Sequence, residues 1–494
     1  MRTVRKGPIS AKQPAKQPPQ GKKVVSRSST GQTGAARSVK SSVGPTRKMP
    51  PKKAGNNRFT WLFFCLTGIA MLSATAGALL AVSLSSTPLM QRKLSSADAA
   101  VFNKSGIASQ NNLKMPGLTR PVNILLLGTK VLTTDVSEVP AHLKDAKYQA
   151  LVNSFEGLTD TMLLIRFNPE NKKVSVLSIP RDTRTAIPGH STRKINEANA
   201  LGGPPLAARA ASELLGGVGV DRYISMNVQG VEALVEALGG VTVNVPKDMK
   251  YQDDSQHLYI NLKAGRQHLN GTKTLQLLRF RQDALGDIGR IQRQQMVMRA
   301  IMEQALNPAT ITRLPSILSV IQSHIDTNLS VEEIVALVGY AAQTNRSNTQ
   351  MLMIPGEFSH PGEFDASYWL PSQKRIQDIM ARHFDFGDLG AEDTTSQSVR
   401  ITLQDSTKQP DRVQTVLRAL QKSGYSNSSL GQPWTESLSV TRIVAQQGNT
   451  KSADAVREAL GFGEIRIETT GDLDSDVTIQ LGKDSLQQKP KPQR

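Results

Sequence analysis

The stretch TMLLIRFNPENKKVSVLSIPRDTR (161–184) decides the fold of this chain. It contains two apolar runs, TMLLIRFN (161–168) and VSVLSIP (174–180), and between them PENKK (169–173), which is typical of a hairpin turn. Short apolar runs of this kind predict strands that are buried on both faces of a sheet. The stretch therefore predicts an antiparallel hairpin at the centre of a folded domain.

The sequence on both sides of this hairpin adds further strands and helices. VNILLLG (122–128), which closes on a glycine, and VTVNVP (241–246) predict two more strands. Helical spacing marks four stretches: LAARAASELLGG (206–217), VEALVEALGG (231–240), 290–306 and 331–342. The first two end in glycine pairs that suit helix C-caps. Strands that alternate with helices predict an α/β fold with helices covering the sheet.

A polar, glycine-containing segment at 384–397 predicts a linker to a second, smaller α/β domain at 398–483. Strand-like and helix-like runs alternate in this second domain, but its residues form no catalytic pattern. An interaction module that binds a glycan or a protein is therefore one interpretation of it. The last residues, 484–494, are polar and are expected to be disordered.

The N-terminal residues 1–58 carry most of the net charge of +19, because they contain 15 Lys and Arg and no acidic residue. The tail is rich in Pro, Gly, Ser and Gln, a composition that predicts disorder. A tail of this kind binds polyanions, so a membrane-tethered regulator that acts through it is a second interpretation of the chain. The tail has no aromatic residue for base stacking, so specific nucleic-acid binding is not expected.

The segment FTWLFFCLTGIAMLSATAGALLAVS (59–83) has no charged residue and predicts a single transmembrane helix. As a helix it spans about 37 Å, more than the roughly 30 Å of a hydrocarbon core. A buried core helix or a cleaved signal peptide fits less well, because the run is long and has no polar face. The positive-inside rule predicts a cytoplasmic N-terminus and a body on the extracytoplasmic, periplasmic side of the cytoplasmic (inner) membrane. The only cysteine, Cys65, lies in this segment, so the exported part has no disulfide and no thiol nucleophile.

Most standard catalytic motifs are missing, and the unusual feature of the sequence is its arginines. Arg181 directly follows a predicted buried strand, and Arg184 comes three residues later. Arg279 and Arg281 alternate, so on an extended segment they would point the same way. Guanidinium groups match phosphate oxygens and stay charged in apolar surroundings. Converging arginines predict a pyrophosphate site, and the plainer alternative is that each one pairs with a surface carboxylate.

Two further candidates lie close to these arginines in the predicted fold. Arg290 and Gln294 are four residues apart and share one face of a predicted helix. Asp160 stands just before the first strand of the hairpin, and Mg²⁺ favours one or two carboxylates together with substrate phosphates. An aspartate that merely forms a turn is the alternative interpretation of Asp160.

Taken in order, these segments resemble the LytR-CpsA-Psr family of cell-wall ligases. The matching blocks are NILLLGT (123–129), TDTMLL (159–164), VSVLSIPRDT (174–183), RKINEANALGG (193–203), LGGVTVNVP (238–246), LKAGRQHLNGTKTLQLLRFR (262–281) and GDIGRIQRQQ (286–295). The resemblance covers roughly 121–310, and 398–483 resembles more weakly the C-terminal LytR-type domain of the family.

The resemblance implies a glycopolymer–peptidoglycan phosphotransferase. Such an enzyme moves a glycan phosphate from a polyprenyl-pyrophosphate carrier onto peptidoglycan or another envelope acceptor, as in cell-wall or exopolysaccharide assembly, and releases polyprenyl phosphate. It also implies an α/β/α sandwich with an apolar tunnel for the lipid. The expected organisation is a basic cytoplasmic tail (1–58), a transmembrane helix (59–83), a linker (84–120), the catalytic domain (121–383), a linker (384–397), the LytR-type domain (398–483) and a disordered tail (484–494).

The resemblance also implies roles for individual residues. The expected pyrophosphate ligands are Arg181, Arg279, Arg281 and Arg290, with Arg184 and Gln294 beside them. Asp160 is expected to bind Mg²⁺, and Asp287 either orients an arginine or assists proton transfer.

One residue departs from the family pattern. Lys130 stands where the family usually has a second metal-binding aspartate. Lys130 either supplies positive charge to the substrate in place of part of the metal, or Asp135 in the following loop serves as the metal ligand. A polyprenyl-pyrophosphate pyrophosphatase would use the same residues, and only its independence of an acceptor would distinguish it from a transferase.

Overall fold

The computed structural model describes residues 93–109, 116–130, 155–254, 258–280, 286–344, 348–388, 399–446 and 448–487. All of them belong to one of two compact units of the chain, Leu72–Arg494, and none to the other, Met1–Met71. Several predicted features therefore lie outside the described residues: the basic tail, the transmembrane helix at 59–83, Asp135 and Arg281. Within the described ranges, no helix combines the length and the apolar character needed to cross a membrane.

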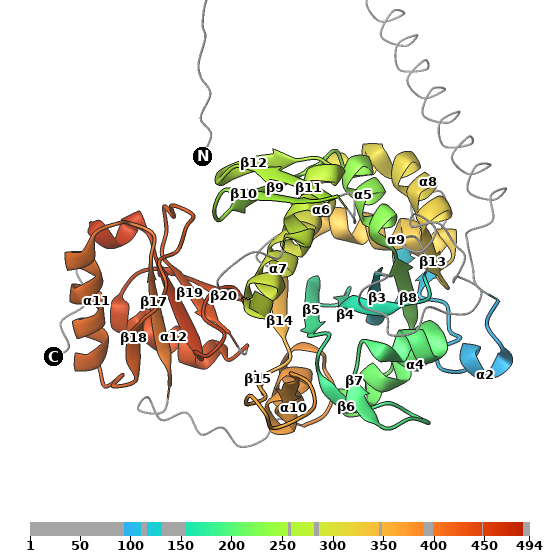
Figure 1. The fold of residues 1–494 in the computed structure, drawn as a ribbon, viewed down its shortest axis with the longest axis horizontal. Coiled ribbons are helices and arrows are strands. Elements are labelled where there is room, and N and C mark those ends of the chain that lie inside the picture. Colours follow the sequence, from blue (N-terminus) through green and yellow to red (C-terminus); the bar gives the residue numbers. More distant parts are fainter. Residues whose placement is uncertain are drawn as a thin grey trace, which may run out of the picture. The chain divides into compact units, whose positions relative to one another are not determined.

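A six-stranded mixed sheet forms the centre of the main domain (Figure 1). Across the sheet the strands follow in the order β13 (Ile325–Thr327), β8 (Arg222–Met226), β3 (Val122–Lys130), β4 (Leu158–Asn168), β5 (Lys173–Ile179) and β14 (Thr349–Met353). β3 runs parallel to β8, and β5 runs parallel to β14, whereas the other neighbours are antiparallel. The predicted hairpin is confirmed, since β4 and β5 pair antiparallel across the PENKK turn.

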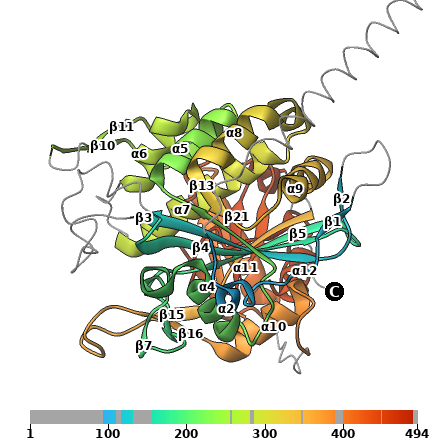
Figure 2. The same cartoon turned by 90° about the vertical axis from the view of Figure 1, so that its right-hand side faces the viewer.

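Helices cover both faces of this sheet, because its central strands are apolar on both sides (Figures 1 and 2). Leu125, Leu164 and Leu177 pack with the helices on one face, whereas Leu163 and Val176 pack with those on the other. The first face is covered by α4 (Glu197–Leu214) and α10 (Gln373–His383), and the second by α7 (Gly286–Ala305), α8 (Leu314–His324) and α9 (Val331–Gln343). The mixed α/β fold predicted from the sequence is thus confirmed.

The predicted glycine C-caps are also present. Gly216 and Gly217 follow α4 with φ angles of 84° and 96°. Gly239 and Gly240 follow α5 (Val228–Ala237) with φ angles of 81° and 88°. These left-handed conformations end the helices and are adopted readily only by glycine.

Smaller elements complete the main domain. They are α2 (Ser96–Ala99), β1 (Ala108–Ser109), β2 (Gly117–Leu118), β6 (Arg184–Ala186), β7 (Thr192–Lys194), β9 (Val241–Val245), β10 (Met249–Asp253), β11 (Leu258–Leu262), β12 (Gly265–Leu269), α6 (Gly271–Arg279), η2 (Pro308–Arg313), β15 (Gly356–Phe358) and β16 (Trp369–Pro371). Phe102 and Ile107 are buried in its core although the sequence suggested a linker there. The packed body of the domain therefore includes residues upstream of the expected boundary at 121.

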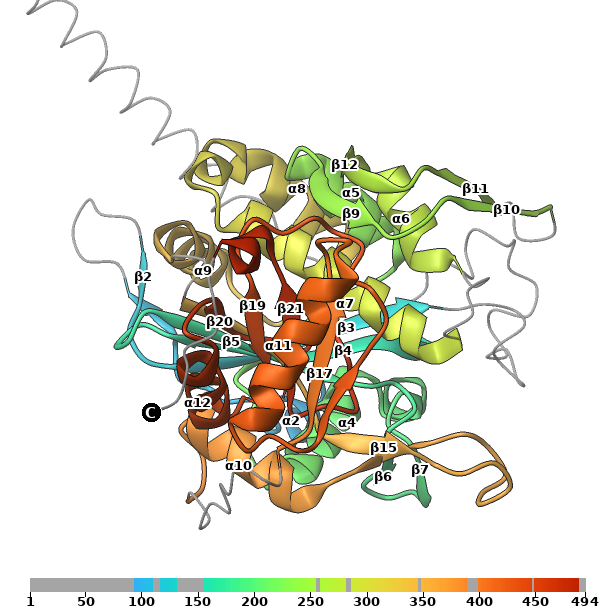
Figure 3. The same ribbon diagram turned by 90° about the vertical axis from the view of Figure 1, so that its left-hand side faces the viewer.

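A second α/β domain follows, as predicted. Its five-stranded sheet has the order β18 (Ser428–Leu430), β17 (Ile401–Asp405), β21 (Val477–Leu481), β19 (Arg442–Ala445) and β20 (Glu464–Ile467). Two helices and a short 3-10 turn complete it: α11 (Pro410–Lys422), α12 (Thr450–Leu460) and η5 (Lys483–Leu486). Figure 3 shows α11 in front of these strands, and both helices share an apolar core with the sheet.

Candidate functional site

A tight turn at the end of β5 holds Arg181 and Asp182. Pro180 ends the strand, and both the amide and the hydroxyl of Thr183 donate to the Pro180 carbonyl oxygen, at 3.0 and 2.6 Å. The carbonyl oxygens of Arg181 and Asp182 accept bonds from the amides of Asn196 and Trp369. The backbone of this turn is therefore fixed before any ligand arrives.

A β-bulge positions Asp160 beside this turn. Gly128 of β3 pairs with Thr161, but the next residue, Thr129, pairs with Thr159, so Asp160 has no partner residue on β3. A bulge of this kind turns one side chain out of the regular alternation of the strand. The Asp160 carboxylate accepts a 2.7 Å bond from Nη1 of Arg181.

Asp182 lies among three cationic side chains. Its Oδ1 is 2.7 Å from Nζ of Lys194, and its Oδ2 is 3.3 Å from Nε of Arg181 and 3.5 Å from Nη2 of Arg290. Among the described side chains, these three cations face two carboxylates, those of Asp160 and Asp182, so these five groups together have a net charge of +1. Neither Asp182 nor Lys194 was predicted from the sequence as a site residue, because the convergence of Lys194 and Arg290 on Asp182 depends on the tertiary fold.

Helix α7 brings Arg290 and Gln294 to the same place. The two residues share a helix face, as predicted from their spacing. Nε2 of Gln294 donates a 3.3 Å bond to the backbone carbonyl oxygen of Asp160. The structure thus brings together four of the predicted site residues: Asp160, Arg181, Arg290 and Gln294.

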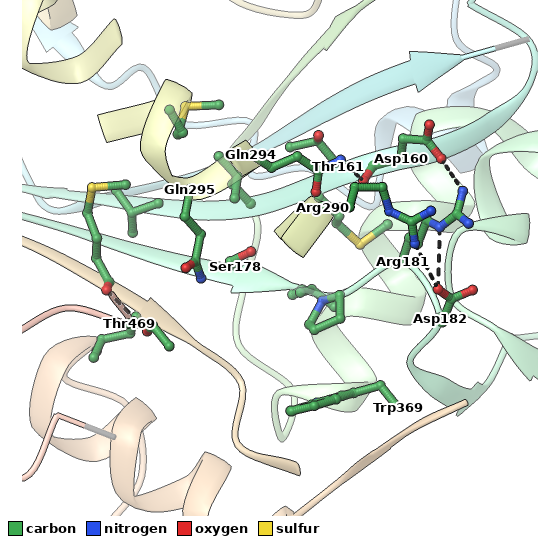
Figure 4. Close-up of a pocket in the computed structure, with 18 of the residues that line it drawn as sticks. Asp160, Thr161, Ser178, Arg181, Asp182, Arg290, Gln294, Gln295, Trp369 and Thr469 are labelled. Atoms are coloured by element: carbon green, nitrogen blue, oxygen red, sulfur yellow. Dashed lines mark hydrogen bonds and ion pairs between the residues drawn. The ribbon is translucent and has the colours of Figure 1, made fainter. Parts of the chain in front are cut away.

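These residues lie at one end of a narrow cavity between α7 and the sheet. Figure 4 shows Arg181, Arg290, Asp160 and Asp182 at one end, Thr469 at the other, and Ser178 and Gln295 between them. Apolar side chains make up much of the wall: Met162, Leu163, Val176, Met298, Met351 and Trp369. The open volume of about 40 Å³ holds only a few water molecules. Its flexible methionines can repack around a larger ligand.

Other predicted residues lie elsewhere. Arg279 is the last residue of helix α6, so it does not lie on an extended segment of the kind that would point Arg279 and Arg281 the same way. The helix forms because Asn270 caps it, and because Thr274 and Leu277 bury one face at helical spacing. The Arg184 guanidinium stacks 4.7 Å above the ring of Phe364. The substrate-binding roles of Arg184 and Arg279 stay predictions.

The remaining predicted residues are described only in part or not at all. Lys130 is the last residue of β3, opposite Leu158, and Asp287 lies in the first turn of α7, but their side chains are outside the described part of the structure. Arg281 and Asp135 lie outside it entirely. Their expected roles also stay predictions.

The candidate metal ligand in the described part is Asp160. In those ranges no group of three or more His, Cys, Asp or Glu side chains is suited to hold a metal ion. Asp160 and Asp182 nevertheless line the same cavity as Arg181 and Arg290. This donor set fits Mg²⁺, which keeps several waters and takes the rest of its ligands from substrate phosphates.

The model of the LytR_cpsA_psr family matches residues 90–385, more than half of the chain. A second model, described as LytR cell envelope-related transcriptional attenuator, matches residues 398–484. The chain belongs to the LytR-CpsA-Psr family, as the sequence resemblance indicated.

The relatives that match the chain include a protein named as a regulator and a protein named as a transferase. It is 35% identical to the regulatory protein MsrR of Staphylococcus aureus over 176 residues, which cover 35% of this chain and 52% of that protein. The chain thus spans about half the length of this relative. It is 32% identical over 230 residues to the polyisoprenyl-teichoic acid–peptidoglycan teichoic acid transferase TagU of Bacillus cereus, covering 45% of this chain and 71% of that protein. A crystal structure of Bacillus subtilis TagV is 25% identical, with a TM-score of 0.45, and the match covers 55% of this chain and 99% of that one.

Proposed function

We propose that this protein transfers a glycan phosphate from a polyprenyl-pyrophosphate carrier to a hydroxyl group of peptidoglycan or another envelope glycan. One observation carries the proposal: a cationic group with two half-buried arginines stands at the end of a cavity with largely apolar walls. A pyrophosphate linked to an isoprenoid chain has the same division into an anionic head and an apolar tail. The name of TagU, a relative that transfers teichoic acid from a polyisoprenyl carrier, supports the same donor and acceptor classes.

The reaction exchanges one phosphorus–oxygen bond for another. The acceptor hydroxyl oxygen bonds to the phosphorus next to the glycan, the bond from that phosphorus to the bridging oxygen breaks, and polyprenyl phosphate leaves. Arg181, Arg290 and Lys194 stabilise the negative charge on the phosphate oxygens and on the leaving group. The hydroxyl proton passes to a base, which is one of the two roles predicted for Asp287.

We also propose a magnesium ion and a membrane anchor. Mg²⁺, held by Asp160 and by the substrate, would neutralise phosphate charge and polarise the phosphorus. Residues 59–83 would anchor the chain in the cytoplasmic membrane, with the basic tail inside and the catalytic domain outside. This topology brings the cavity to the side of the membrane on which peptidoglycan lies.

The first prediction concerns dependence on the acceptor. We expect the full-length protein in detergent micelles to release polyprenyl phosphate from a polyprenyl-pyrophosphate oligosaccharide at least about tenfold faster when peptidoglycan fragments are present, because the attacking hydroxyl belongs to the acceptor. Release is measured by thin-layer chromatography of a radiolabelled donor. Release at the same rate without acceptor would identify a pyrophosphatase. Absence of release from several donors would support a protein that binds the carrier without reacting.

A second prediction concerns the metal. We expect EDTA to lower the transfer rate at least about tenfold and added Mg²⁺ to restore it, because the ion shares the charge of the pyrophosphate with the arginines. Asp160→Asn should raise the Mg²⁺ concentration needed for half-maximal rate. Asp98→Asn is the matched control, because Asp98 also pairs with an arginine, Arg209, but is not one of the residues that line the cavity. A rate that is insensitive to EDTA would show that cationic side chains alone carry the charge, as one interpretation of Lys130 suggests.

A further inference from the structure

The end of the cavity opposite the arginines is formed by the second domain. Thr469 and Thr470, which follow β20, line the cavity together with Met298 and Arg299 of α7 and Met351 of β14 (Figure 4). These two threonines are far from the main domain in sequence, and the family match of the main domain ends at residue 385. The second domain is therefore part of the cavity wall.

Backbone contacts hold this segment against the main domain. β14 and β20 are edge strands of their sheets, and edge strands carry unpaired amide and carbonyl groups. Met351 and Glu468 form a parallel bridge, and the amide of Thr469 donates a 2.8 Å bond to the Met351 carbonyl oxygen. The contact thus uses backbone groups that are available at both sheet edges.

Side chains of α7 and α10 strengthen this contact. Arg299 forms an ion pair with Glu468, and Nε2 of Gln292 donates a 3.2 Å bond to the Gly471 carbonyl oxygen. Burial lowers the pKa of His383 to about 4, so the ring is neutral near pH 7, and its Nε2 lies 3.1 Å from the Gly448 carbonyl oxygen. The second domain is therefore tied to α7, the helix that carries Arg290.

The same segment is also fixed from within the second domain. The Thr470 carbonyl oxygen accepts bonds of 3.1 Å from the side-chain amides of Gln446 and Gln480, which are both buried. The Thr470 hydroxyl donates a 3.0 Å bond to Glu468. Contacts from both domains therefore fix the backbone of residues 468–470, so this segment forms a well-ordered part of the cavity wall.

Beyond this wall the surroundings become more polar, because charged side chains mix with apolar ones. A second cavity of about 350 Å³ begins at Arg299 and Met351, which line both cavities. Its lining combines the charged side chains of Glu303, Glu464 and Arg466 with apolar ones such as Met302, Leu306 and Ile465. An isoprenoid chain that passed the wall would cover charged side chains as well as apolar ones, and desolvation of the charged groups costs free energy. The apolar cavity before the wall is therefore the more favourable site for the chain.

From this geometry we propose that Thr469 and Thr470 form the stop for the isoprenoid chain and set the length of chain that the enzyme binds best. The inference rests on the proposed function, because it takes the cavity ligand to be a polyprenyl carrier. The second domain then acts as a specificity-determining part of the donor site, in addition to any interaction it makes with a glycan or a protein.

Binding of polyprenyl phosphates of different length to the full-length protein tests the proposal. We expect Thr470→Trp, which fills the closed end, to bind geranyl phosphate within about twofold of wild type but undecaprenyl phosphate at least tenfold more weakly, by isothermal titration calorimetry in micelles. Ser439→Trp, on the exposed surface of the same domain, should change neither affinity. Equal affinities of wild type and Thr470→Trp for the long chain would overturn the proposal. If wild type bound neither lipid, the proposed function itself would fail.

A second measurement needs no variant and so does not depend on correct folding of Thr470→Trp. Undecaprenyl phosphate with a diazirine at its far end is bound to wild type and irradiated. We expect the label in the tryptic peptide Ile467–Lys483, which contains both threonines. Label confined to peptides of the main domain, such as Val174–Arg181 and Gln294–Arg299, would overturn the proposal.

Discussion

Arg181→Ala should lower the transfer rate by about 10²–10³-fold, the effect typical of removing one preorganised donor to a developing negative charge. Arg181 stands at the charged end of the cavity, on a turn whose backbone is fixed by the amides of Asn196 and Trp369. Its loss also leaves the carboxylates of Asp160 and Asp182 less neutralised, so they repel the pyrophosphate. The rate constant kcat and the KM for the donor are measured separately with a labelled polyprenyl-pyrophosphate oligosaccharide.

Two further variants make this test specific. Arg181→Lys keeps the charge but cannot contact both carboxylates with a forked group, so we expect an intermediate loss of about tenfold. Arg209→Ala removes an arginine from the surface of α4, where it pairs only with Asp98 among the described contacts, and should leave kcat unchanged. If Arg181→Ala retained more than a third of the wild-type rate, the arginines would serve binding or folding and not the reaction.

The main strands and helices could be predicted because they depend on local patterns. The apolar runs before and after PENKK form β4 and β5, and the glycine pairs at 216–217 and 239–240 end α4 and α5. β14 was not predicted, because it forms by parallel pairing with β5, a segment far away in sequence. Pairing of this kind is decided by the tertiary fold and leaves little trace in the local sequence.

The site was predicted only in part, for a related reason. Arginine side chains near the ends of predicted strands and helices indicated Arg181 and Arg290, since a charged group beside an apolar run calls for an explanation. The bulge that turns the Asp160 side chain out of the regular alternation of β4 depends on the register between β3 and β4. The sequence does not specify this register residue by residue. Asp182 gains its importance only when Lys194 and Arg290 converge on it. Thr469 and Thr470 could not be predicted as site residues, because they reach the cavity only through the docking of the second domain.

The arginine cluster and the second domain are linked through one helix. Arg290 contacts Asp182, and about two and a half turns further along α7 Arg299 contacts Glu468 of the second domain. Because the open cavity is narrow, a lipid chain can enter only if α7 moves away from the sheet or if the methionines repack. Either change would alter the position or the surroundings of Arg299, which lies on α7 and lines the cavity. Lipid binding and the docking of the second domain are therefore expected to influence each other.

Glu333→Ala should have the largest effect on stability, with a loss of about 3–5 kcal/mol in the free energy of unfolding. Its carboxylate accepts bonds of 3.0 and 2.6 Å from Nε and Nη2 of Arg222, and both side chains are buried. It also accepts the Ser330 amide in a capping box at the start of α9. Removing it leaves a buried guanidinium without its counter-charge and removes one of the two bonds of the capping box, whereas the bond from the residue 333 amide to the Ser330 hydroxyl remains.

Glu332→Ala is the matched control for this prediction. Glu332 is in the same first turn of α9 but is exposed, so its replacement should change stability by no more than about 0.5 kcal/mol. Unfolding is followed in urea through the fluorescence of Trp369, which is buried in the main domain, with Trp61 and Trp434 replaced by phenylalanine in every variant.

Arg222 also donates to the carbonyl oxygen of Ser105. Loss of the Glu333 carboxylate should therefore loosen the segment around Phe102 and Ile107 first. Hydrogen exchange at the amides of these two residues should rise in Glu333→Ala but not in Glu332→Ala. Equal unfolding midpoints for the two variants would mean that water enters the site and solvates the guanidinium as well as the carboxylate does.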